Sequence, residues 1–296
     1  DICNVKGSEL SDKAKADLVV GGPPCQSFSS SGKQKSILDD RGLLVHQFIR
    51  IVEELKPRTF LFENVRGLVT ARDERGEPGG VIRKLLDKFS QIGYSCRTAL
   101  LNSADYGAFQ RRVRCFIVGS RNGTAPLFPE PTHSKEGDMF LSKWKSLRAF
   151  LEKYADSDES NYTYPTETLE KELQQLPNGS GLKSKGKAEA TRPGGHWGYR
   201  QGTFIADLDL PARTVTGSSS QDWVRWEGRL RRLTLNEVKR LQGFPDDWDL
   251  CGTKAQKFKQ VGNAVPVTFG EILGKRIFSF LEDYPLGPPV KIDIPK

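Results

Sequence analysis

The chain has 296 residues, of which 36% are hydrophobic and 28% are charged. This composition provides for a sizeable buried core, in one large domain or in one domain with a smaller lobe. No apolar run approaches the roughly 18–20 residues that cross a bilayer, and the N-terminus carries no signal pattern, so we expect a soluble cytoplasmic protein without a membrane partner. The net charge of +8 is compatible with a polyanion as partner but does not require one.

The cysteines argue against a disulfide framework and against a metal centre. There are five of them, they are scattered, no CxxC pair occurs, and only three histidines accompany them. A reducing compartment and the absence of a metal site are therefore the expectation.

The first 120 residues alternate apolar strands with amphipathic helices. Strands are expected at 17–20, 59–62, 94–101 and 114–119, and helices at 42–55 and 81–89. This alternation predicts an α/β fold with a mostly parallel sheet. Ligands of such sheets bind at the carboxyl ends of the strands, where Gly21 to Cys25 and Glu63 to Val65 fall.

The pattern changes after residue 120. Residues 152–172 are acidic and read as a solvated face, whereas 183–200 are basic and glycine-rich with two interleaved aromatic residues, which favours contact with a nucleic-acid backbone. Thr234 and Glu237 form a capping-box pattern for a helix that ends near residue 242. A last helix is expected over 267–281, and residues 262–266 read as a loop between helices.

Three features could carry chemistry. Cys25 follows a tight turn at a strand end, where a thiol can be an exposed nucleophile, although free cysteines are commonly buried and structural. Glu63 follows an apolar strand and could be a proton donor in a pocket, or simply an acid at a helix start. Gln110, Arg112 and Arg114 share one face of an extended segment, which suits recognition of anions or carbonyls, or forms a basic surface cluster.

Taken together and in order, the motifs resemble those of the DNA cytosine-5 methyltransferase family. The motifs are Pro23-Pro-Cys-Gln26, Glu63-Asn-Val65, Gln110-Arg-Arg-Val-Arg114, Arg240-Leu-Gln-Gly-Phe-Pro245 and Gly262-Asn-Ala-Val265. The resemblance implies a Rossmann-like sheet of the kind found in S-adenosylmethionine-dependent methyltransferases, with a smaller target-recognition domain. The expected domains are a catalytic part at 1–119, target recognition at 120–230 and a return to the catalytic part at 231–296.

The resemblance also implies the chemistry. Cys25 would attack carbon 6 of a flipped cytosine, and Glu63 would contact the ring at N3 and protonate it. Arg112 and Arg114 would hold the base and the active-site loop. Carbon 5 would then take the methyl group of S-adenosylmethionine, which leaves as S-adenosylhomocysteine.

Candidate binding residues follow from the same resemblance. The cofactor would contact Asp1, Ile2, Pro24, Leu44, Asn263 and Val265, and double-stranded DNA would contact Ser31, Lys33, Arg41, Arg192, His196, Arg200 and Gln201.

Two of the family's cofactor motifs, a glycine loop and an acid that binds the ribose, do not occur in the chain. Because the chain starts at Asp1 and not at Met, we expect that an N-terminal segment or a second chain completes the cofactor site. The alternatives are a subunit of a split enzyme, a DNA-binding pseudoenzyme, and an RNA cytosine-5 methyltransferase. The composition resembles bacterial or phage modification enzymes, which implies a nucleoid-associated cytoplasmic protein with a restriction endonuclease as a possible partner.

Overall fold

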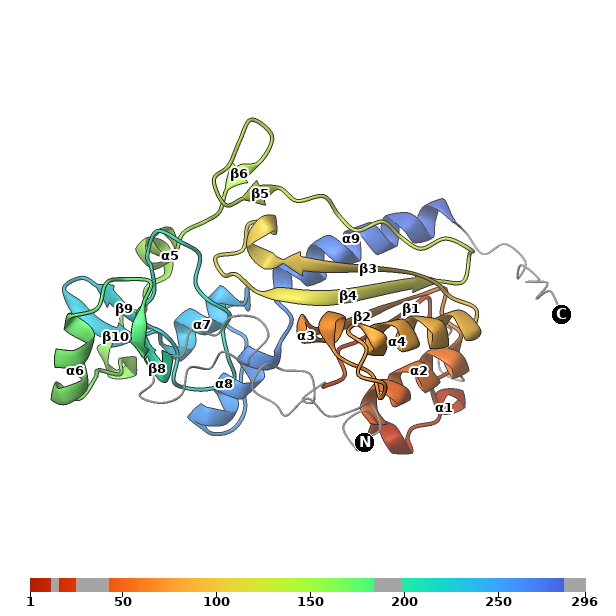
Figure 1. Cartoon of the computed structure of the whole chain (residues 1–296), viewed down its shortest axis with the longest axis horizontal. Helices are drawn as coiled ribbons and strands as arrows, with labels where there is room; N and C mark the ends of the chain where they lie inside the picture. The colour runs from red at the N-terminus through yellow and green to blue at the C-terminus, as the bar shows by residue number, and fades with distance from the viewer. Residues whose placement is uncertain (12–15, 25–42, 184–198, 285–296) are drawn as a thin grey trace. The chain divides into compact units, whose positions relative to one another are not determined.

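In the computed structural model, residues 1–11, 16–24, 43–183 and 199–284 are described. The chain forms two compact units (Figure 1). Unit 1 comprises residues 1–101, 113–129 and 273–296, and unit 2 comprises 102–112 and 130–272. The assignment of 120–230 to target recognition stays a prediction.

Unit 1 is built on a four-stranded sheet with the order β1-β2-β4-β3 (Figure 1). The strands are β1 (Leu18–Gly21), β2 (Thr59–Val65), β3 (Ser95–Asn102) and β4 (Val113–Ser120), and the helices are η1 (Ile2–Asn4), α1 (Gly7–Ser11), α2 (Leu43–Leu55), α3 (Gly67–Thr70) and α4 (Gly80–Gln91). The expected strands and the two expected helices of this region are thereby confirmed as α/β elements.

The sheet is less parallel than expected. β1 runs parallel to β2, but β4 runs antiparallel to β2. Parallel neighbours need a long crossover connection, which α2 supplies between β1 and β2. Between β3 and β4 the chain has only residues 103–112, too short for a helical crossover, and it turns back on itself.

An aromatic cluster fills the core of unit 1. Phe60 stacks on Phe89 with ring centroids 4.2 Å apart, and Phe48 meets Phe62 edge-on at 5.3 Å. All four rings are at most 5% exposed. Apolar side chains on α2 and α4 therefore pin these helices to β2, the strand that carries Glu63.

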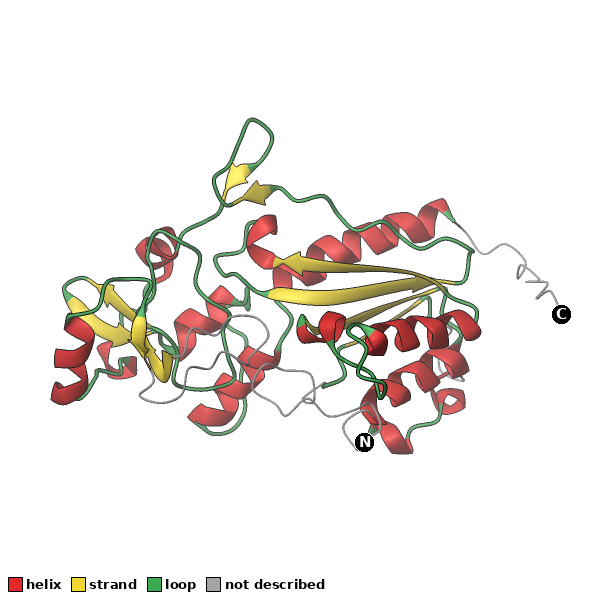
Figure 2. Ribbon diagram, viewed as in Figure 1, coloured by secondary structure: helices red, strands yellow, loops and turns green. Residues whose placement is uncertain are grey.

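Unit 2 combines short helices with two-stranded sheets (Figure 2). Its helices are η3 (Ser103–Tyr106), α5 (Leu147–Tyr154), η4 (Glu159–Asn161), α6 (Glu167–Gln174), α7 (Leu235–Leu241) and α8 (Lys254–Asn263), and its strands are β5 (His133–Ser134), β6 (Ser142–Lys143), β7 (Gly181–Lys183), β8 (Tyr199–Phe204), β9 (Trp223–Trp226) and β10 (Arg229–Arg232). The final helix α9 (Val267–Asp283) begins in unit 2 and ends in unit 1. The capping box of Thr234 and Glu237 is confirmed at α7.

One local expectation is wrong, and another has an exception. Gly262 and Asn263 do not lie in a loop but form the last residues of α8. The acidic stretch is mostly exposed, as expected. Asp156 is the exception at 8% exposed, and its carboxylate accepts hydrogen bonds from Thr234 Oγ1, Asn161 and Asn236.

Among the described helices, none has the length and apolar character required to cross a bilayer. Within the same residues, no cluster of His, Cys, Asp and Glu side chains is arranged to hold a metal ion.

Candidate active site and DNA-binding elements

The neighbouring ends of β1 and β2 bring two of the motifs together. The parallel register pairs Gly21 with Phe62, so Gly22 follows directly beside Glu63. A Cβ on Gly22 would lie 2.9 Å from Glu63 Oε2. Residue 22 must therefore be glycine for the Glu63 carboxylate to occupy this place.

Glu63 lies inside β2 and not beyond it, which corrects the expected strand end at residue 62. The strand continues because Glu63, Asn64 and Val65 pair with residues 116, 115 and 114 of β4. This pairing places Arg114 next to Glu63, and Arg114 Nε lies 3.0 Å from Glu63 Oε1. The two side chains are 14% and 15% exposed.

The Glu63–Arg114 pair is electrostatically coupled in a poorly solvated place. Burial lowers the pKa of the Arg114 guanidinium, and the attraction of Glu63 opposes that shift. A carboxyl group that is held in a fixed orientation by a guanidinium can accept a hydrogen bond at a defined point when ionised and donate one there when protonated, as general acid–base chemistry requires.

Asn64 ties the turn after β1 to the same strand. Its side-chain Nδ2 donates to the Pro23 carbonyl at 3.2 Å, and the side chain is only 3% exposed. Pro24 is the last described residue before a gap at 25–42, so Cys25 lies outside the described residues. Asn64 thus fixes the path of the chain two residues before the predicted nucleophile.

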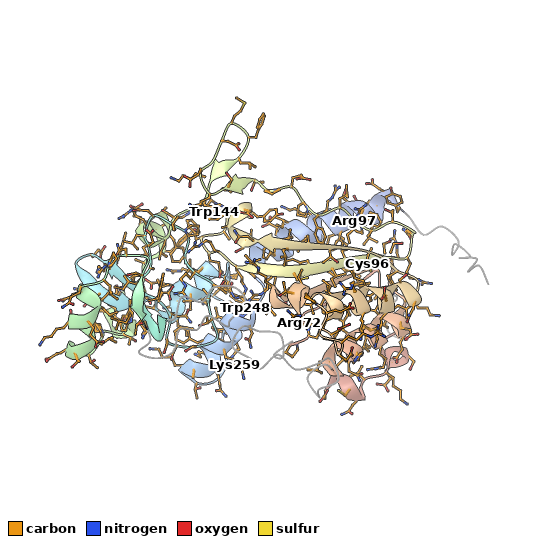
Figure 3. All side chains as sticks on the ribbon, in the orientation of Figure 1. Arg72, Cys96, Arg97, Trp144, Trp248 and Lys259 are labelled. Atoms are coloured by element: carbon orange, nitrogen blue, oxygen red, sulfur yellow. The ribbon has the colours of Figure 1, made fainter. Side chains whose placement is uncertain are left out.

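Two of the other cysteines, Cys96 and Cys115, do not suit nucleophilic catalysis. Burial raises the pKa of the Cys96 and Cys115 thiols to about 12, so both remain protonated at neutral pH. Cys96 lies on β3 (Figure 3), and Cys115 is fully buried in β4. Cys3 and Cys251 are exposed.

Arg112 lies in unit 2 and binds backbone carbonyls. It is therefore not part of a basic surface cluster, the alternative interpretation of its motif. The side chain is 2% exposed and donates to the carbonyl oxygens of Val215 (2.9 Å), Gly262 (2.8 Å) and Ala264 (3.0 Å). In a regular helix the Gly262 carbonyl would receive the N–H of residue 266, but that residue is a proline and has none. Arg112 replaces the missing donor.

Two glutamines extend this buried network. Gln110 Nε2 donates to Gln242 Oε1 at 2.6 Å, and Gln242 Nε2 donates to the carbonyls of Val261 and Ala264 at 2.6 and 3.1 Å. Both glutamines are at most 1% exposed. Three motifs that lie far apart in the sequence, those at 110–114, 240–245 and 262–265, are thereby joined in one network.

Gly262 makes the closest approach of this region. A Cβ at this position would lie 2.3 Å from the backbone nitrogen of Gly217 and 2.4 Å from the carbonyl oxygen of Thr216. No flexible side-chain end could yield here, so only glycine fits.

The predicted cofactor residues are divided between the units. In unit 1, Asp1, Ile2 and Pro24 are exposed and Leu44 is half-buried, whereas in unit 2 Asn263 is exposed and Val265 is half-buried. Asp1 Oδ1 accepts the N–H of Cys3, and the Ile2 side chain is 41% exposed. An exposed carboxylate beside an exposed aliphatic side chain fits the amine and the flat face of an adenine.

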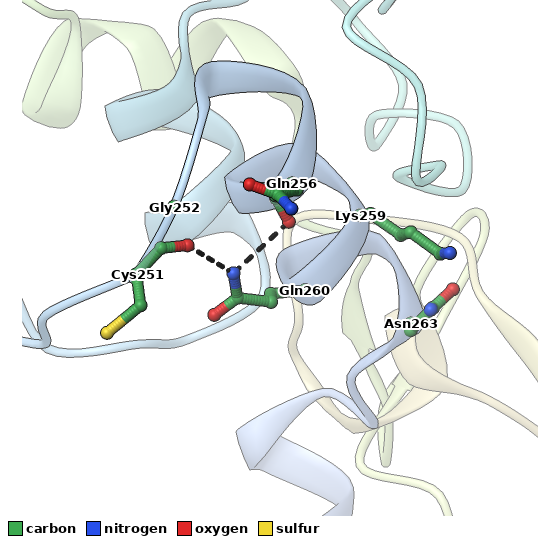
Figure 4. Close-up of a pocket in the computed structure, with 6 residues that line it drawn as sticks. All are labelled: Cys251, Gly252, Gln256, Lys259, Gln260 and Asn263. Atoms are coloured by element: carbon green, nitrogen blue, oxygen red, sulfur yellow. Dashed lines mark hydrogen bonds between the residues drawn. The ribbon is translucent and has the colours of Figure 1, made fainter.

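Asn263 also lines a pocket of about 440 Å³ on α8, shown in Figure 4. Gln260 and Cys251 also line it, and Gln260 Nε2 donates to the Cys251 carbonyl at 2.7 Å. The other lining residues are Gly252, Gln256 and Lys259.

Most of the predicted DNA contacts cannot be placed. Ser31, Lys33, Arg41, Arg192 and His196 lie outside the described residues. Arg200 and Gln201 lie in β8, and only their backbone is described.

Sequence reasoning missed the steric roles of Gly22 and Gly262 and the structural role of Gln242. The glycines stand inside recognisable motifs, but nothing local to them shows which neighbour approaches. For Gln242, a polar residue directly after a capped helix was the available signal.

These contacts join the motifs into two clusters, and comparison with known proteins gives the family of the chain. Residues 1–279 match the C-5 cytosine-specific DNA methylase family. The chain belongs to this family. It is 33% identical over 287 residues to the Type II methyltransferase M.SacI of Streptomyces achromogenes, covering 89% of this chain and 72% of that protein.

Further comparisons agree with this assignment. The chain is 30% identical to the Type II methyltransferase M.FnuDI of Fusobacterium nucleatum, covering 96% of this chain and 81% of that protein. The S. pombe Dnmt2 methyltransferase has the same fold, with a TM-score of 0.62 at 19% identity over 97% of this chain and 84% of that one. The DNA cytosine-5 methyltransferase expected from the motifs is confirmed, and the pseudoenzyme, split-enzyme and RNA alternatives are not favoured.

Proposed function

We propose that this cytosine-5 DNA methyltransferase works through a covalent adduct of Cys25, with Glu63 and Arg114 completing the catalytic group. The observation that carries the proposal is the Glu63–Arg114 pair beside Gly22, three residues before Cys25. A carboxyl group held at this position, on the strand next to the one that leads to Cys25, supports the role of proton donor that we assign to Glu63.

In this mechanism the Cys25 thiolate adds to carbon 6 of the cytosine, and the electron pair of the 5,6 double bond moves into the ring. Glu63 hydrogen-bonds the ring at N3 and the exocyclic amine, and it donates a proton to N3 as negative charge develops there. S-adenosylmethionine supplies the methyl group that carbon 5 takes. Loss of the proton from carbon 5 to a base then restores the double bond and expels the Cys25 thiolate, and the proton on N3 returns to the Glu63 carboxylate.

The remaining motif residues position these groups. Arg114 fixes the orientation of Glu63, and Arg112 acts indirectly, since it holds the segment that contains Asn263 and Val265. We assign the binding of S-adenosylmethionine to Asn263 and Val265, together with Asp1, Ile2, Pro24 and Leu44. Ser31, Lys33 and Arg41 would accompany the extrusion of the base from the duplex, and Arg192, His196, Arg200 and Gln201 would contact the recognised sequence.

We also propose that the protein acts in the bacterial cytoplasm as the modification enzyme of a restriction system. The support is the similarity to Type II methyltransferases. Its partners would be duplex DNA and, in the same system, a restriction endonuclease.

A trapping experiment tests the catalytic proposal. Duplex DNA that carries 5-fluorocytosine blocks the final loss of the substituent at carbon 5, so the wild-type protein with S-adenosylmethionine should form an adduct that survives denaturing electrophoresis. Cys25→Ser should form none, and Glu63→Gln should form it far more slowly. Cys251→Ser, which removes an exposed cysteine, is the matched control and should behave like the wild type. An adduct that persists in Cys25→Ser would overturn the assignment.

A further inference from the structure

A pocket of about 210 Å³ in unit 2 is lined by two arginines to which the proposed mechanism gives no role. It is lined by Gly179, Phe204, Ala206, Asp207, Leu210 and Pro211, together with Arg111 and Arg213. Among the described residues, the Arg111 guanidinium takes part in no hydrogen bond or ion pair.

The local backbone explains why the two arginines face the same way. Gln110 and Ala212 form a parallel β-bridge, and Arg111 N donates to the Ala212 carbonyl at 2.8 Å. Residues one step along a parallel pair, here Arg111 and Arg213, project to the same face. The alternation that sends Gln110 and Arg112 into the buried network thus sends Arg111 into the pocket.

The rest of the pocket holds the arginines in place. The Arg213 guanidinium lies 4.0 Å over the Phe204 ring, and its Nη1 is 3.5 Å from Asp222 Oδ1. Burial lowers the pKa of Arg111, and the positive charge of Arg213 lowers it further, while Asp207 and Asp222 oppose the shift. Arg111 is thus a cation that would gain from a further anionic partner.

The charges around the pocket do not cancel. The charged side chains that line the pocket are Arg111, Arg213 and Asp207. Two arginines against one carboxylate leave one positive charge in excess, which equals the single negative charge of a phosphodiester. A phosphate projects from the surface of a duplex and can enter a small pocket, whereas the edge of a paired base lies flat in a groove.

We propose that Arg111 and Arg213 clamp one backbone phosphate of the DNA substrate in this pocket. The planar forks of two guanidiniums match the phosphate oxygens. The proposal builds on the assignment of the protein as a DNA methyltransferase and adds a contact that is independent of the recognised sequence.

The test is binding of the full chain to a fluorescent duplex of arbitrary sequence at several salt concentrations, read as anisotropy. Loss of one phosphate contact reduces the slope of log K against log salt by about 0.9. Arg111→Gln should show this reduction and bind about 5- to 20-fold more weakly at low salt. Arg111→Lys keeps the charge and should retain the slope with an intermediate affinity.

Two controls make the outcome decisive. Arg83→Gln removes one charge from a surface ion pair in unit 1 and should leave both slope and affinity within twofold of the wild type. Thermal unfolding of Arg111→Gln should match the wild type, since its guanidinium bonds no described residue. An unchanged slope in Arg111→Gln would overturn the phosphate clamp, as would a loss confined to the cognate sequence, which would indicate a base contact. Failure of the wild-type protein to bind any duplex would instead contradict the proposed function.

Discussion

Arg112 offers the sharpest link between one side chain and the integrity of the motifs. Arg112→Met keeps the aliphatic part of the side chain and removes the three charge-assisted hydrogen bonds to Val215, Gly262 and Ala264. The Ala264 carbonyl retains a donor in Gln242. The Val215 and Gly262 carbonyls lose their hydrogen bonds from Arg112, and Pro266 has no N–H that could donate to the Gly262 carbonyl instead.

The magnitude follows from these contacts. An unsatisfied buried polar group costs about 1–3 kcal/mol, and a hydrogen bond to a charged group contributes about 1.5–3 kcal/mol. Two abandoned carbonyls and one weakened contact therefore lower the free energy of unfolding of unit 2 by about 4 kcal/mol. Arg112→Lys, whose ammonium cannot span all three oxygens, should lose about half of that.

Urea denaturation followed by tryptophan fluorescence measures this effect. All five tryptophans belong to unit 2 by residue number, so the signal reports on the unit that holds Arg112. Arg83→Met, on the surface of unit 1, is the control and should be neutral. A free energy of unfolding of Arg112→Met within about 1 kcal/mol of the wild type would show that the hydrogen bonds of Arg112 do not stabilise the unit.

Three further predictions concern other contacts. Gly22→Ala should push the Glu63 carboxylate from its place and reduce the rate of methyl transfer by about 10- to 100-fold. Gly274→Ala, where nothing lies within 4 Å of an added Cβ, should leave the rate unchanged. Equal rates for the two variants in a tritium-transfer assay would contradict the steric role of Gly22. Glu237→Gln breaks a buried ion pair with Arg231, whose nitrogens lie 2.7 and 2.9 Å from the carboxylate. It should lower the free energy of unfolding by about 3–5 kcal/mol. Glu159→Gln, which breaks an exposed ion pair, should leave the free energy of unfolding nearly unchanged in the same urea titration. Burial raises the pKa of Cys96 and Cys115 in the folded protein from 9.0 to about 12. The stability that their neutral thiols contribute is therefore complete below pH 9 and declines as the pH rises toward 12. Between about pH 8 and 10.5 the wild type should lose more stability than the double variant Cys96→Ala, Cys115→Ala, and equal losses would show that these thiols do not titrate in this way.

Local pattern was sufficient for much of this protein. The strands and helices of residues 17–120, the capping box at Thr234 and the helix after Pro266 follow from apolar periodicity and side-chain caps, which act within a few residues. The ordered motifs around Cys25, Glu63, Arg112 and Asn263 also carry the family, because the chemistry demands particular residue types at particular places.

Tertiary structure decided what those residues touch. Pairing with β4 extended β2 through Glu63 and brought Arg114 to its carboxylate. The backbone of Thr216 and Gly217, which is remote in sequence, determines that residue 262 is glycine. The alternation of side chains along 110–113 was visible in the sequence, but which face would be buried was not. Arg112 is buried against the carbonyls of Val215, Gly262 and Ala264, whereas Arg111 lines a pocket. Contacts between segments that lie far apart in the chain depend on the packing of the whole unit, and no local pattern encodes them.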